Sequence, residues 1–425
     1  MKKDFWVLLF LAILVFALWY KALFNFFAQD DFILINHFSQ NNVWQDLKNL
    51  FGPPTVTHWR PIHNLYFFVT GNVFSKNYLG YHILTFFFHI SASFLIYKTV
   101  QKLAKNPKVA ITAAFIYAVH PAHFVSLFWI SGSATMIGFF LLISSFYGYL
   151  IGKKGHSLIL FILAILASEA MIIGLAIFAG YEFLYKRKKI DKQFLTIIGS
   201  TSVIFLIIKF ALFTSKTTFD VYQLELSTKV FPAIKYYLLR IAGFAETSGD
   251  KIASWILSVW LTFVALLLIK TLNKKQNFNQ FILSVAIIIV GLFPFVLIPQ
   301  HLSPHYMNIS IFGFSIMIAL ALKQLRPVLS LVFLIIFLGI AAYNINLTKS
   351  NNWVIERSNL ASIYLEQIKE IKPLPESTLV FPNSKLSTSK EAYISLGNGE
   401  AIKFWFKNKN YKYCFTAFGK CSALP

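Results

Sequence analysis

Residues 5–24, FWVLLFLAILVFALWYKALF, decide the fold class of this chain, and two acids follow them closely at Asp30 and Asp31. A run of about 20 predominantly apolar residues is long enough to cross the hydrocarbon core of a bilayer as a helix. The run is too long for a signal peptide and poor in small-residue cleavage sites, so we predict a retained helix. That helix delivers both carboxylates to the far face of the membrane, where ionisable groups are costly to desolvate and usually functional.

The composition extends this prediction to the whole chain. Of its 425 residues, 57% are hydrophobic and 13% are charged, whereas soluble domains carry about 25% charged residues. Apolar runs of similar length recur along most of the sequence. The net charge of +22 comes from short Lys and Arg clusters between those runs, which is typical of cytoplasmic loops and argues against a nucleic-acid partner. We therefore predict a multi-pass protein of the cell membrane, surrounded by membrane lipids.

Charge also predicts the topology of an all-α polytopic protein. Lys2 and Lys3 place the N-terminus in the cytoplasm by the positive-inside rule. If successive loops then alternate between the two sides of the membrane, the chain has eleven membrane-spanning helices. The first outer loop, which runs to Leu79, is expected to hold helices lying along the interface. A second long outer loop is expected over residues 214–250. The expected spans are 5–24, 80–100, 109–119, 136–150, two short helices within 156–185 that turn near Ser168-Glu169, 194–213, 254–269, 281–298, 309–322 and 328–343.

The chain divides into a membrane domain, residues 1–345, and a polar C-terminal domain, residues 346–425, on the extracytoplasmic side. Proline and glycine interrupt the C-terminal part and predict a small α+β domain. Its expected elements are a helix at 353–371 and strands at 379–381, 392–396 and 401–406. Cys414 and Cys421 lie in this domain; in an oxidising compartment they could pair across a short loop, and the sequence leaves pairing open.

This topology gathers titratable side chains at the outer face. Asp30, Asp31 and Glu169 fall there with three cations and nine of the ten histidines. An interfacial preference of the imidazole ring explains any single histidine equally well, but a polar cavity that opens outward explains the collection better. The cations are Arg60, Lys235 and Arg240, and the histidines are His37, His58, His63, His82, His89, His120, His123, His301 and His305.

Two roles are open to the adjacent aspartates. One can cap a helix over residues 32–38, because Asp is a favoured N-cap residue, but capping cannot occupy both. The functional alternative makes one carboxylate the general base toward an acceptor hydroxyl, while the other positions substrate or a divalent cation such as Mg²⁺ or Mn²⁺. Asp31 is the candidate metal ligand.

Three other polar groups have an alternative of the same kind. Glu169 is either a hydrated turn carboxylate or part of the predicted cavity. His120 and His123 could hold a metal only on a helix, and the intervening proline and the lack of a third ligand argue against zinc. Trp59-Arg60 is either a membrane-interface anchor or a binding element for a substrate phosphate.

The order of these motifs resembles the C-type membrane glycosyltransferases, and within them the group related to protein O-mannosyltransferases, which includes the transmembrane and tetratricopeptide-repeat mannosyltransferases. The matching stretches are Gln29-Asp30-Asp31-Phe32, Trp59-Arg60-Pro61, Gly80-Tyr81-His82, His120-Pro121, Trp129-Ile130, Ser168-Glu169 and His305-Tyr306. The departures from the family pattern are Val125, Ser133, Thr135, Ser168 and His305, and the repeat tail is replaced by the small outer domain.

The resemblance implies an enzyme that moves a sugar from a polyprenyl-phosphate donor to a protein, lipid or glycan hydroxyl at the extracytoplasmic face. Asp30 or Asp31 would deprotonate the acceptor, and inversion would follow. Cations would stabilise the departing phosphate. The candidate binding residues are Arg60, His82, His120, Glu169, Lys235, Arg240, His305 and Tyr306.

The alternative is a membrane transporter or a flippase for lipid-linked carbohydrate. Such a protein is expected to place charges or broken helices near the bilayer midplane and often to show internal repeats. Here the charged groups gather at one face, which favours the transferase.

Overall fold

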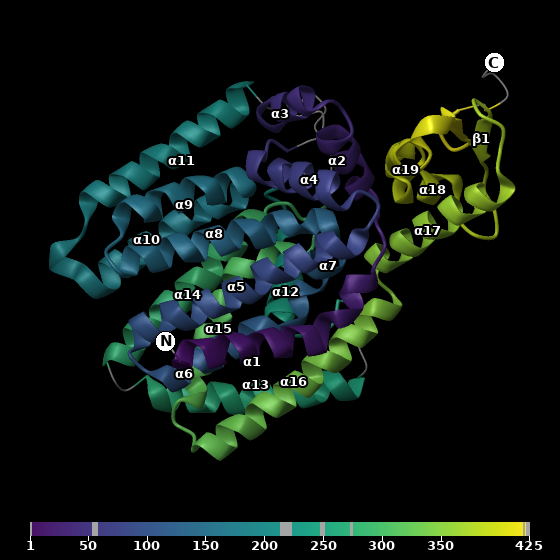
Figure 1. The fold of residues 1–425 in the computed structure, drawn as a ribbon. Helices are drawn as coiled ribbons and strands as arrows, with labels where there is room; N and C mark the ends of the chain where they lie inside the picture. Colours follow the sequence, from purple (N-terminus) through teal and green to yellow (C-terminus); the bar gives the residue numbers. More distant parts are fainter. Residues whose placement is uncertain are drawn as a thin grey trace.

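Helices dominate the computed structural model, which describes residues 2–52, 58–212, 223–246, 251–272, 275–419 and 421 (Figure 1). Within these ranges, eight helices are long and apolar enough to cross a membrane, or nine if one bent pair counts as a single span. The eight are α1 (Lys2–Trp19, extended by a 3₁₀ turn to Phe24), α5 (Tyr78–Ala104), α8 (Ser133–Leu150), α11 (Lys192–Leu212), α13 (Lys251–Thr271), α14 (Lys275–Val296), α15 (Asn308–Leu322) and α16 (Pro327–Ser350).

The expected count of eleven spans is not confirmed, although each expected span contains helix. The bent pair consists of α6 (Pro107–Val119) and residues 121–128, which include α7 (Phe124–Phe128), with an angle of 46° between its two parts. Pro121 explains this break, because proline cannot donate the backbone hydrogen bond that a continuous helix needs. The helix α9 (Lys154–Ala167) has 14 residues, fewer than the ~20 needed to cross. The helix α10 (Gly174–Tyr181) has 8, but helical turns at Glu169–Ile173 and Glu182–Lys186 continue it on both sides. Neither stretch is among the eight candidate spans.

The core of the bundle forms around α15, whose residues are almost all buried. It packs against α6, α13 and α14. The outer helices α1, α13 and α16 instead expose large apolar side chains, among them Trp6, Phe263 and Val328. Apolar surface of this extent marks a face that another phase or partner covers, and its position on long apolar helices is compatible with lipid.

The first loop contains three helices, as expected: α2 (Asp30–Ser39), α3 (Val43–Phe51) and α4 (Pro61–Phe74). Helix α3 exposes Val43, Trp44 and Phe51 while it buries Asp46 and Leu50. This amphipathic pattern is typical of a helix that lies in a membrane interface. The second long loop, expected over 214–250, contains α12 (Val230–Ala242). Its residues 214–222 and 247–250, and residue 213 at the end of the preceding expected span, lie outside the described part of the chain.

The C-terminal segment folds into a unit beside the bundle, at the right of Figure 1. The helix α17 (Trp353–Ile371) and the strand β1 (Thr378–Phe381) confirm two sequence predictions. The expected strands at 392–396 and 401–406 are wrong, because α18 (Ser389–Ser395) and α19 (Glu400–Trp405) occupy those positions. The partner of β1 is instead β2 (Lys412–Phe415), which pairs with it in parallel. The boundary expected at residue 345 lies inside α16.

Local sequence explains why helices replace the two strands. Thr388 and Glu391 form a capping box at the start of α18, which satisfies donors that a helix N-terminus otherwise leaves open. Gly397 and Gly399 have φ values of 57° and 92°, a conformation that favours glycine and lets the chain reverse between α18 and α19.

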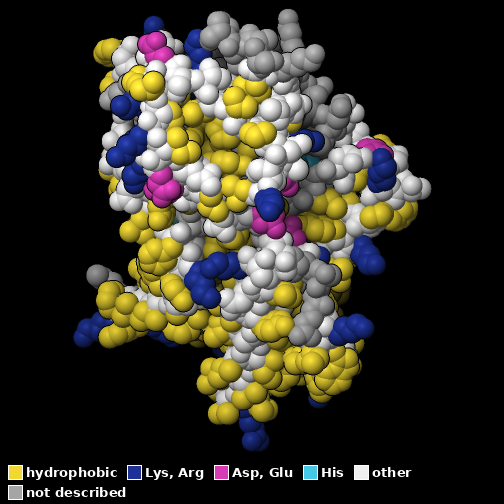
Figure 2. Space-filling model, turned by 90° about the vertical axis from the view of Figure 1, so that its right-hand side faces the viewer, with side chains coloured by type: hydrophobic (Ala, Val, Ile, Leu, Met, Phe, Trp, Pro, Cys, Tyr) yellow, Lys and Arg dark blue, Asp and Glu magenta, His cyan; other side chains and the backbone are white. Residues whose placement is uncertain are grey.

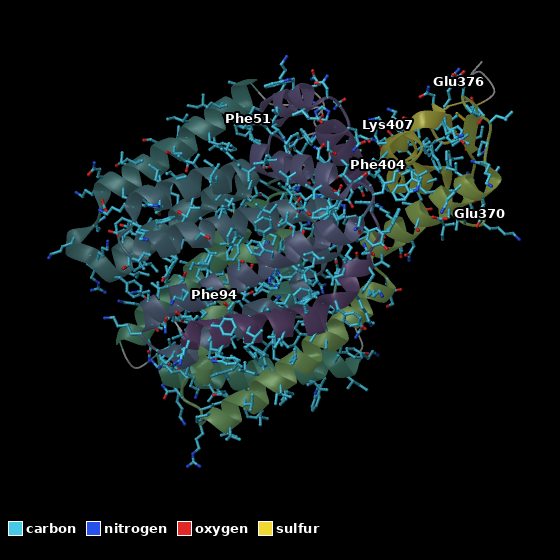
Figure 3. All side chains as sticks on the ribbon, viewed as in Figure 1. Phe51, Phe94, Glu370, Glu376, Phe404 and Lys407 are labelled. Atoms are coloured by element: carbon cyan, nitrogen blue, oxygen red, sulfur yellow. A yellow bond between two sulfur atoms is a disulfide. The ribbon has the colours of Figure 1, made fainter. Side chains whose placement is uncertain are left out.

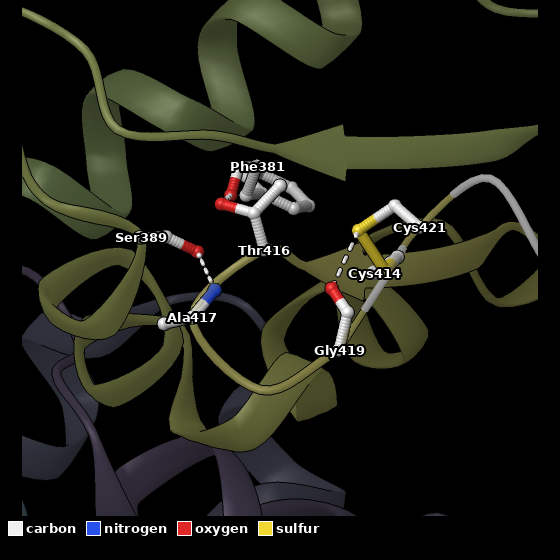
Figure 4. The surroundings of a disulfide bond; sticks show 7 residues. All are labelled: Phe381, Ser389, Cys414, Thr416, Ala417, Gly419 and Cys421. Carbon is white, nitrogen blue, oxygen red and sulfur yellow. Dashed lines mark hydrogen bonds between the residues drawn. A yellow bond between two sulfur atoms is a disulfide. The ribbon is translucent and has the colours of Figure 1, made fainter.

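Cys414 and Cys421, whose pairing the sequence left open, form a disulfide with a Cα–Cα distance of 5.6 Å (Figure 4). The bond links β2 to the segment that follows it. In the same turn, the backbone N–H of Ala417 donates to Ser389 Oγ at 3.2 Å. These two links tie the end of the described chain to β2 and α18.

The C-terminal unit packs on the residues that precede α2. Phe404 is buried against Phe27, at a ring-centroid distance of 6.1 Å, and it lies on the bundle side of the unit, whereas Glu370 and Glu376 lie on its outer side (Figure 3). The N–H of Gln29 donates to the carbonyl of Ser395 at 3.1 Å. The C-terminal unit therefore meets the bundle at the segment between α1 and α2, which leads directly into the paired aspartates.

Candidate functional site

A cavity of about 400 Å³ lies where five distant segments meet, and we call it the Asp30 cavity. The segments are the start of α2, residues 58–64, the α7–α8 junction, residues 300–306, and the first turns of α17. Figure 2 views the molecule from the side of the C-terminal unit, and it shows acidic and basic side chains among hydrophobic ones on this face. The lining residues are Gln29, Asp30, Leu34, His58, Arg60, His63, Asn64, Trp129, Ser131, Gly132, Ala134, Thr135, Gln300, His301, Leu302, Ser303, His305, Tyr306, Trp353 and Arg357.

Asp30 lines this cavity from the first turn of α2. The residue before it, Gln29, has φ 54° and ψ −113°, a strained conformation for a residue with a Cβ. The Gln29 backbone is held by Ser395, and its Oε1 accepts a hydrogen bond of 2.5 Å from Arg357 Nη1. Burial raises the pKa of Asp30, while the hydrogen bond from Gln29 and the charges of Arg357 and Arg60 act in the opposite direction.

Asp31 does not line the cavity, and its carboxylate is fully occupied by the protein. Oδ1 accepts hydrogen bonds from the N–H and the hydroxyl of Ser131 at 2.8 and 2.5 Å, and Oδ2 accepts one from Ala28 N–H at 2.9 Å. Burial raises the pKa of Asp31 to about 7, although these three donors favour the anion. Asp31 therefore joins α2 to the α7–α8 junction, and its carboxylate faces protein donors and not the cavity; a metal-binding role for it stays a prediction.

Glu169 lies behind the cavity and positions two of its lining residues. Its carboxylate receives Arg60 Nε at 2.7 Å and Arg60 Nη2 at 3.0 Å. His58 Nδ1 and Lys209 Nζ also approach it, at 3.3 and 3.2 Å. A bidentate pair fixes the plane of the guanidinium, so Glu169 aims Arg60. It is part of an ion network and not a turn group paired only with water.

His305 and Tyr306, two of the predicted binding residues, line the cavity. His305 Nδ1 and Ser303 Oγ lie 2.6 Å apart, and the rings of His305 and Tyr306 have centroids 3.9 Å apart. The Tyr306 ring also stacks on Phe295, at 4.4 Å and an interplanar angle of 9°. Trp129 reaches the His305 ring from the α7–α8 junction. The wall is therefore aromatic and fixed by packing.

Four predicted binding residues lie elsewhere. His82 contacts the carbonyls of Asn25 and Leu127 at 3.0 and 3.1 Å, and His120 contacts the carbonyl of Ile241 at 2.8 Å. Both rings are buried and satisfy backbone groups that would otherwise lack a partner. Lys235 is exposed on α12, and Arg240 lies over the Tyr236 ring and donates to the carbonyl of Phe244 at 3.0 Å.

Sequence reasoning missed the contribution of α17. Trp353 and Arg357 both line the cavity, and the guanidinium carbon lies 4.8 Å from the Trp353 ring centroid. A spacing of four residues on a helix places two side chains on one face, which permits this cation–π contact. That spacing was readable within the predicted helix 353–371, but assigning these residues to a separate domain concealed their proximity to Asp30.

The described side chains of the cavity do not by themselves form a divalent-cation site. Among the described residues, no group of three or more His, Cys, Asp or Glu side chains could hold a metal ion. Asp30 is the one carboxylate on the described cavity wall, and the charges beside it are the guanidinium groups of Arg357 and Arg60. Mg²⁺ is commonly held by one or two carboxylates together with substrate phosphate and water; here the protein contributes one carboxylate, beside two guanidinium groups whose positive charge disfavours a divalent cation. His120 and His123 are each committed to a backbone carbonyl.

Fold and site together define a helical protein compatible with several membrane crossings, with a polar cavity at one end of the bundle. In comparisons with known proteins, no family model matches the chain, and no curated protein matches it significantly.

Proposed function

We propose that this protein transfers a sugar from a polyprenyl-phosphate donor to an acceptor hydroxyl bound in the Asp30 cavity, at the extracytoplasmic face of the membrane. The observation that carries the proposal is the position of Asp30, a carboxylate that lines a cavity beside two guanidinium groups and three aromatic side chains. Such a cavity, with a few convergent polar groups and a titratable residue of perturbed pKa, is the expected form of an active site.

Asp30 would act as the general base. As the acceptor oxygen forms its bond to the anomeric carbon, the hydroxyl proton passes to the Asp30 carboxylate. The bond from the anomeric carbon to the phosphate oxygen breaks, and its electron pair leaves with the polyprenyl phosphate. Attack and departure on opposite sides of this carbon invert its configuration. Burial raises the pKa of Asp30, which makes its carboxylate a better proton acceptor near neutral pH.

Arg357 and Arg60 are suited to stabilise the departing phosphate, because a planar guanidinium matches phosphate oxygens in pairs. The contacts of Arg357 and Arg60 differ, and this gives the two side chains different roles. Arg60 already pairs with Glu169, whereas the charge of Arg357 is held between Trp353 and Gln29 without a carboxylate hydrogen bond among the described contacts. We therefore infer that Arg357 carries the larger share of the phosphate charge.

The cavity also limits what binds there. A volume of about 400 Å³ is in the range of small-molecule sites, roughly 300–1,000 Å³, so a sugar and a phosphate fill much of it. Trp129, Trp353 and Tyr306 offer apolar ring faces to the sugar. The polyprenyl chain would then extend along the apolar surface of the bundle, and only the hydroxyl-bearing tip of the acceptor would enter.

The test compares Asp30→Asn with Glu356→Gln, which removes an exposed carboxylate one residue from Arg357. Membranes with each variant receive radiolabelled mannosyl or glucosyl polyprenyl phosphate, and label in the acceptor fraction is counted. We expect Asp30→Asn to lose transfer while Glu356→Gln retains it. Full transfer by Asp30→Asn would remove the proposed base. Movement of the intact donor across the bilayer without hydrolysis or transfer would identify a flippase instead.

A further inference from the structure

A second cavity, of about 640 Å³, lies far from Asp30, and we call it the basal cavity. The ends of α5 and α8, the segment that follows α10, and the start of α14 surround it. Its lining residues are Lys102, Leu103, Lys105, Leu150, Tyr181, Leu184, Tyr185, Lys186, Arg187 and Asn279. Nothing in the proposed transfer reaction uses these groups.

The two cavities lie at opposite ends of the helix bundle. The helix α5 begins at Tyr78, which contacts Phe26 and Phe27 near the aspartates, and it ends at Ala104, beside Lys102 and Lys105. Its 27 residues correspond to ~40 Å at 1.5 Å per residue. The basal cavity is therefore at the end of the bundle where α1 begins, and there Lys98 pairs with Asp4 at 2.8 Å.

The basal cavity is cationic. Four Lys or Arg side chains line it, and no Asp or Glu is among its described lining residues. The Tyr185 hydroxyl in the cavity wall is buried and has no hydrogen-bond partner in the described part of the chain. A buried hydroxyl of this kind costs free energy unless a ligand or water completes it.

Local backbone geometry presents these groups to the cavity. Residues Glu182–Lys186 form a π-helical turn, and Arg187 follows with φ 42°. Both features are uncommon and tend to occur at functional positions. The fully buried Glu182 holds the turn, because its carboxylate accepts from Tyr149 Oη at 2.7 Å and pairs with Lys186 Nζ at 3.0 Å. It also accepts from Asp191 N–H at 2.7 Å.

We propose that the basal cavity binds a phosphate group, carried by an anionic phospholipid headgroup or by a soluble phosphate ester. The ammonium groups of Lys102, Lys105 and Lys186 with the Arg187 guanidinium supply charge, and the Tyr185 hydroxyl donates a hydrogen bond to a phosphate oxygen. Basic pockets between membrane helices are suited to lipid phosphate. Leu103, Leu150 and Leu184 form an apolar wall that a lipid chain or glycerol backbone can contact.

The experiment uses the full chain in detergent and native mass spectrometry to count bound molecules. The probes are dioctanoyl phosphatidic acid, glycerol 3-phosphate, and dioctanoylglycerol, which lacks the phosphate. The test variant is Lys102→Gln with Lys105→Gln, since both side chains are exposed and replaceable without a core change. The matched control is Lys3→Gln with Lys153→Gln, which removes two exposed lysines from outside the cavity lining.

We expect phosphatidic acid to bind the wild-type protein and to bind the test variant ~30-fold more weakly, from about 1 kcal/mol for each lysine. Tyr185→Phe should weaken binding by several-fold, and the control pair should bind as the wild type does. Equal variant-sensitive binding of glycerol 3-phosphate would identify a soluble ester as the source, whereas binding of phosphatidic acid alone would identify a lipid. The proposal is overturned if dioctanoylglycerol binds as well, if the test variant binds unchanged, or if both lysine pairs weaken binding equally.

Discussion

Replacing each of the adjacent aspartates with asparagine separates catalysis from stability. In Asp31→Asn, the side-chain oxygen can face either Ser131 or the N–H of Ala28, and the amide NH₂ then faces the other. In both orientations at least one buried donor loses its acceptor. An unsatisfied buried donor costs about 1–3 kcal/mol, and the loss of a charge-assisted bond adds to that. We expect a total of ~2–4 kcal/mol against folding.

Asp30→Asn should behave in the opposite way. The side chain is half-buried and lines a cavity, and burial already disfavours its charged form. The neutral amide therefore leaves stability nearly unchanged. Loss of a general base lowers the rate of a chemical step by about 100- to 10,000-fold, which corresponds to ~2.7–5.4 kcal/mol in the barrier.

The assay measures both quantities on the same samples. Thermal unfolding in detergent, followed by size-exclusion chromatography, reports stability, and transfer from the lipid-linked donor reports rate per folded molecule. We expect Asp31→Asn to unfold a few degrees lower and keep most of its rate per folded molecule, and Asp30→Asn to unfold normally with little rate. The reverse pattern, with a stable but inactive Asp31→Asn, would refute the assignment of the base to Asp30.

Four further outcomes are expected. Arg357→Gln should lower transfer by at least tenfold with little change in unfolding, as judged by the same two assays, because phosphate loses a charge-assisted partner. Transfer by the wild type should increase as the pH rises through the raised pKa of Asp30. Because the Arg357 charge lowers that pKa, the rise in transfer should occur at higher pH in Arg357→Gln. Cys414→Ser should destabilise the C-terminal unit by about 2–3 kcal/mol, seen as faster proteolysis of that unit. In intact cells, a membrane-impermeant thiol reagent should label a cysteine at Asn42 and spare one at Lys154; the opposite pattern would reverse the predicted topology.

The helices were largely predictable, because length and apolar content decide whether a segment can cross a bilayer. The prediction was weakest where helices are short. The break at Ser168-Glu169 was placed correctly, but neither the 14-residue α9 nor the helical stretch around α10 is among the candidate spans, so these two crossings are not confirmed. The positive-inside rule considers only the charges that flank a segment and not the length of the segment, so it counted both helices as crossings.

The strands of the C-terminal unit show a different limit. Aromatic and β-branched residues at 401–406 favour a strand by propensity, yet a helix forms there. Propensity is a weak prior that tertiary packing overrides. For residues 389–395 the sequence did contain the correct indication, because Thr388 followed three residues later by Glu391 is a capping box.

The sequence predicted the kinds of side chain in the candidate site better than it predicted which residues line it. Asp30, Arg60, His305 and Tyr306 line the cavity as expected. His82 and His120 lie at suitable depth, but their rings face backbone carbonyls. Position along a span predicts depth, whereas the direction of a side chain depends on which neighbouring helix packs against it. Which helices pack against each other cannot be deduced from this one sequence.

Two contacts with the C-terminal unit hold Gln29, the residue before Asp30, and on this ground we expect the proposed site to depend on that unit. Gln29 adopts a conformation that costs roughly 1–3 kcal/mol, and it persists because Ser395 holds its backbone while Arg357 holds its side chain. Released from both, residue 29 would relax toward negative φ and turn the first residues of α2, Asp30 with them. The same arginine that positions the base is also placed to receive phosphate charge. In the proposed reaction, base and phosphate partner would both depend on the contacts of Gln29 with Arg357 and Ser395, more than 300 residues away, so the C-terminal unit would form part of the active site.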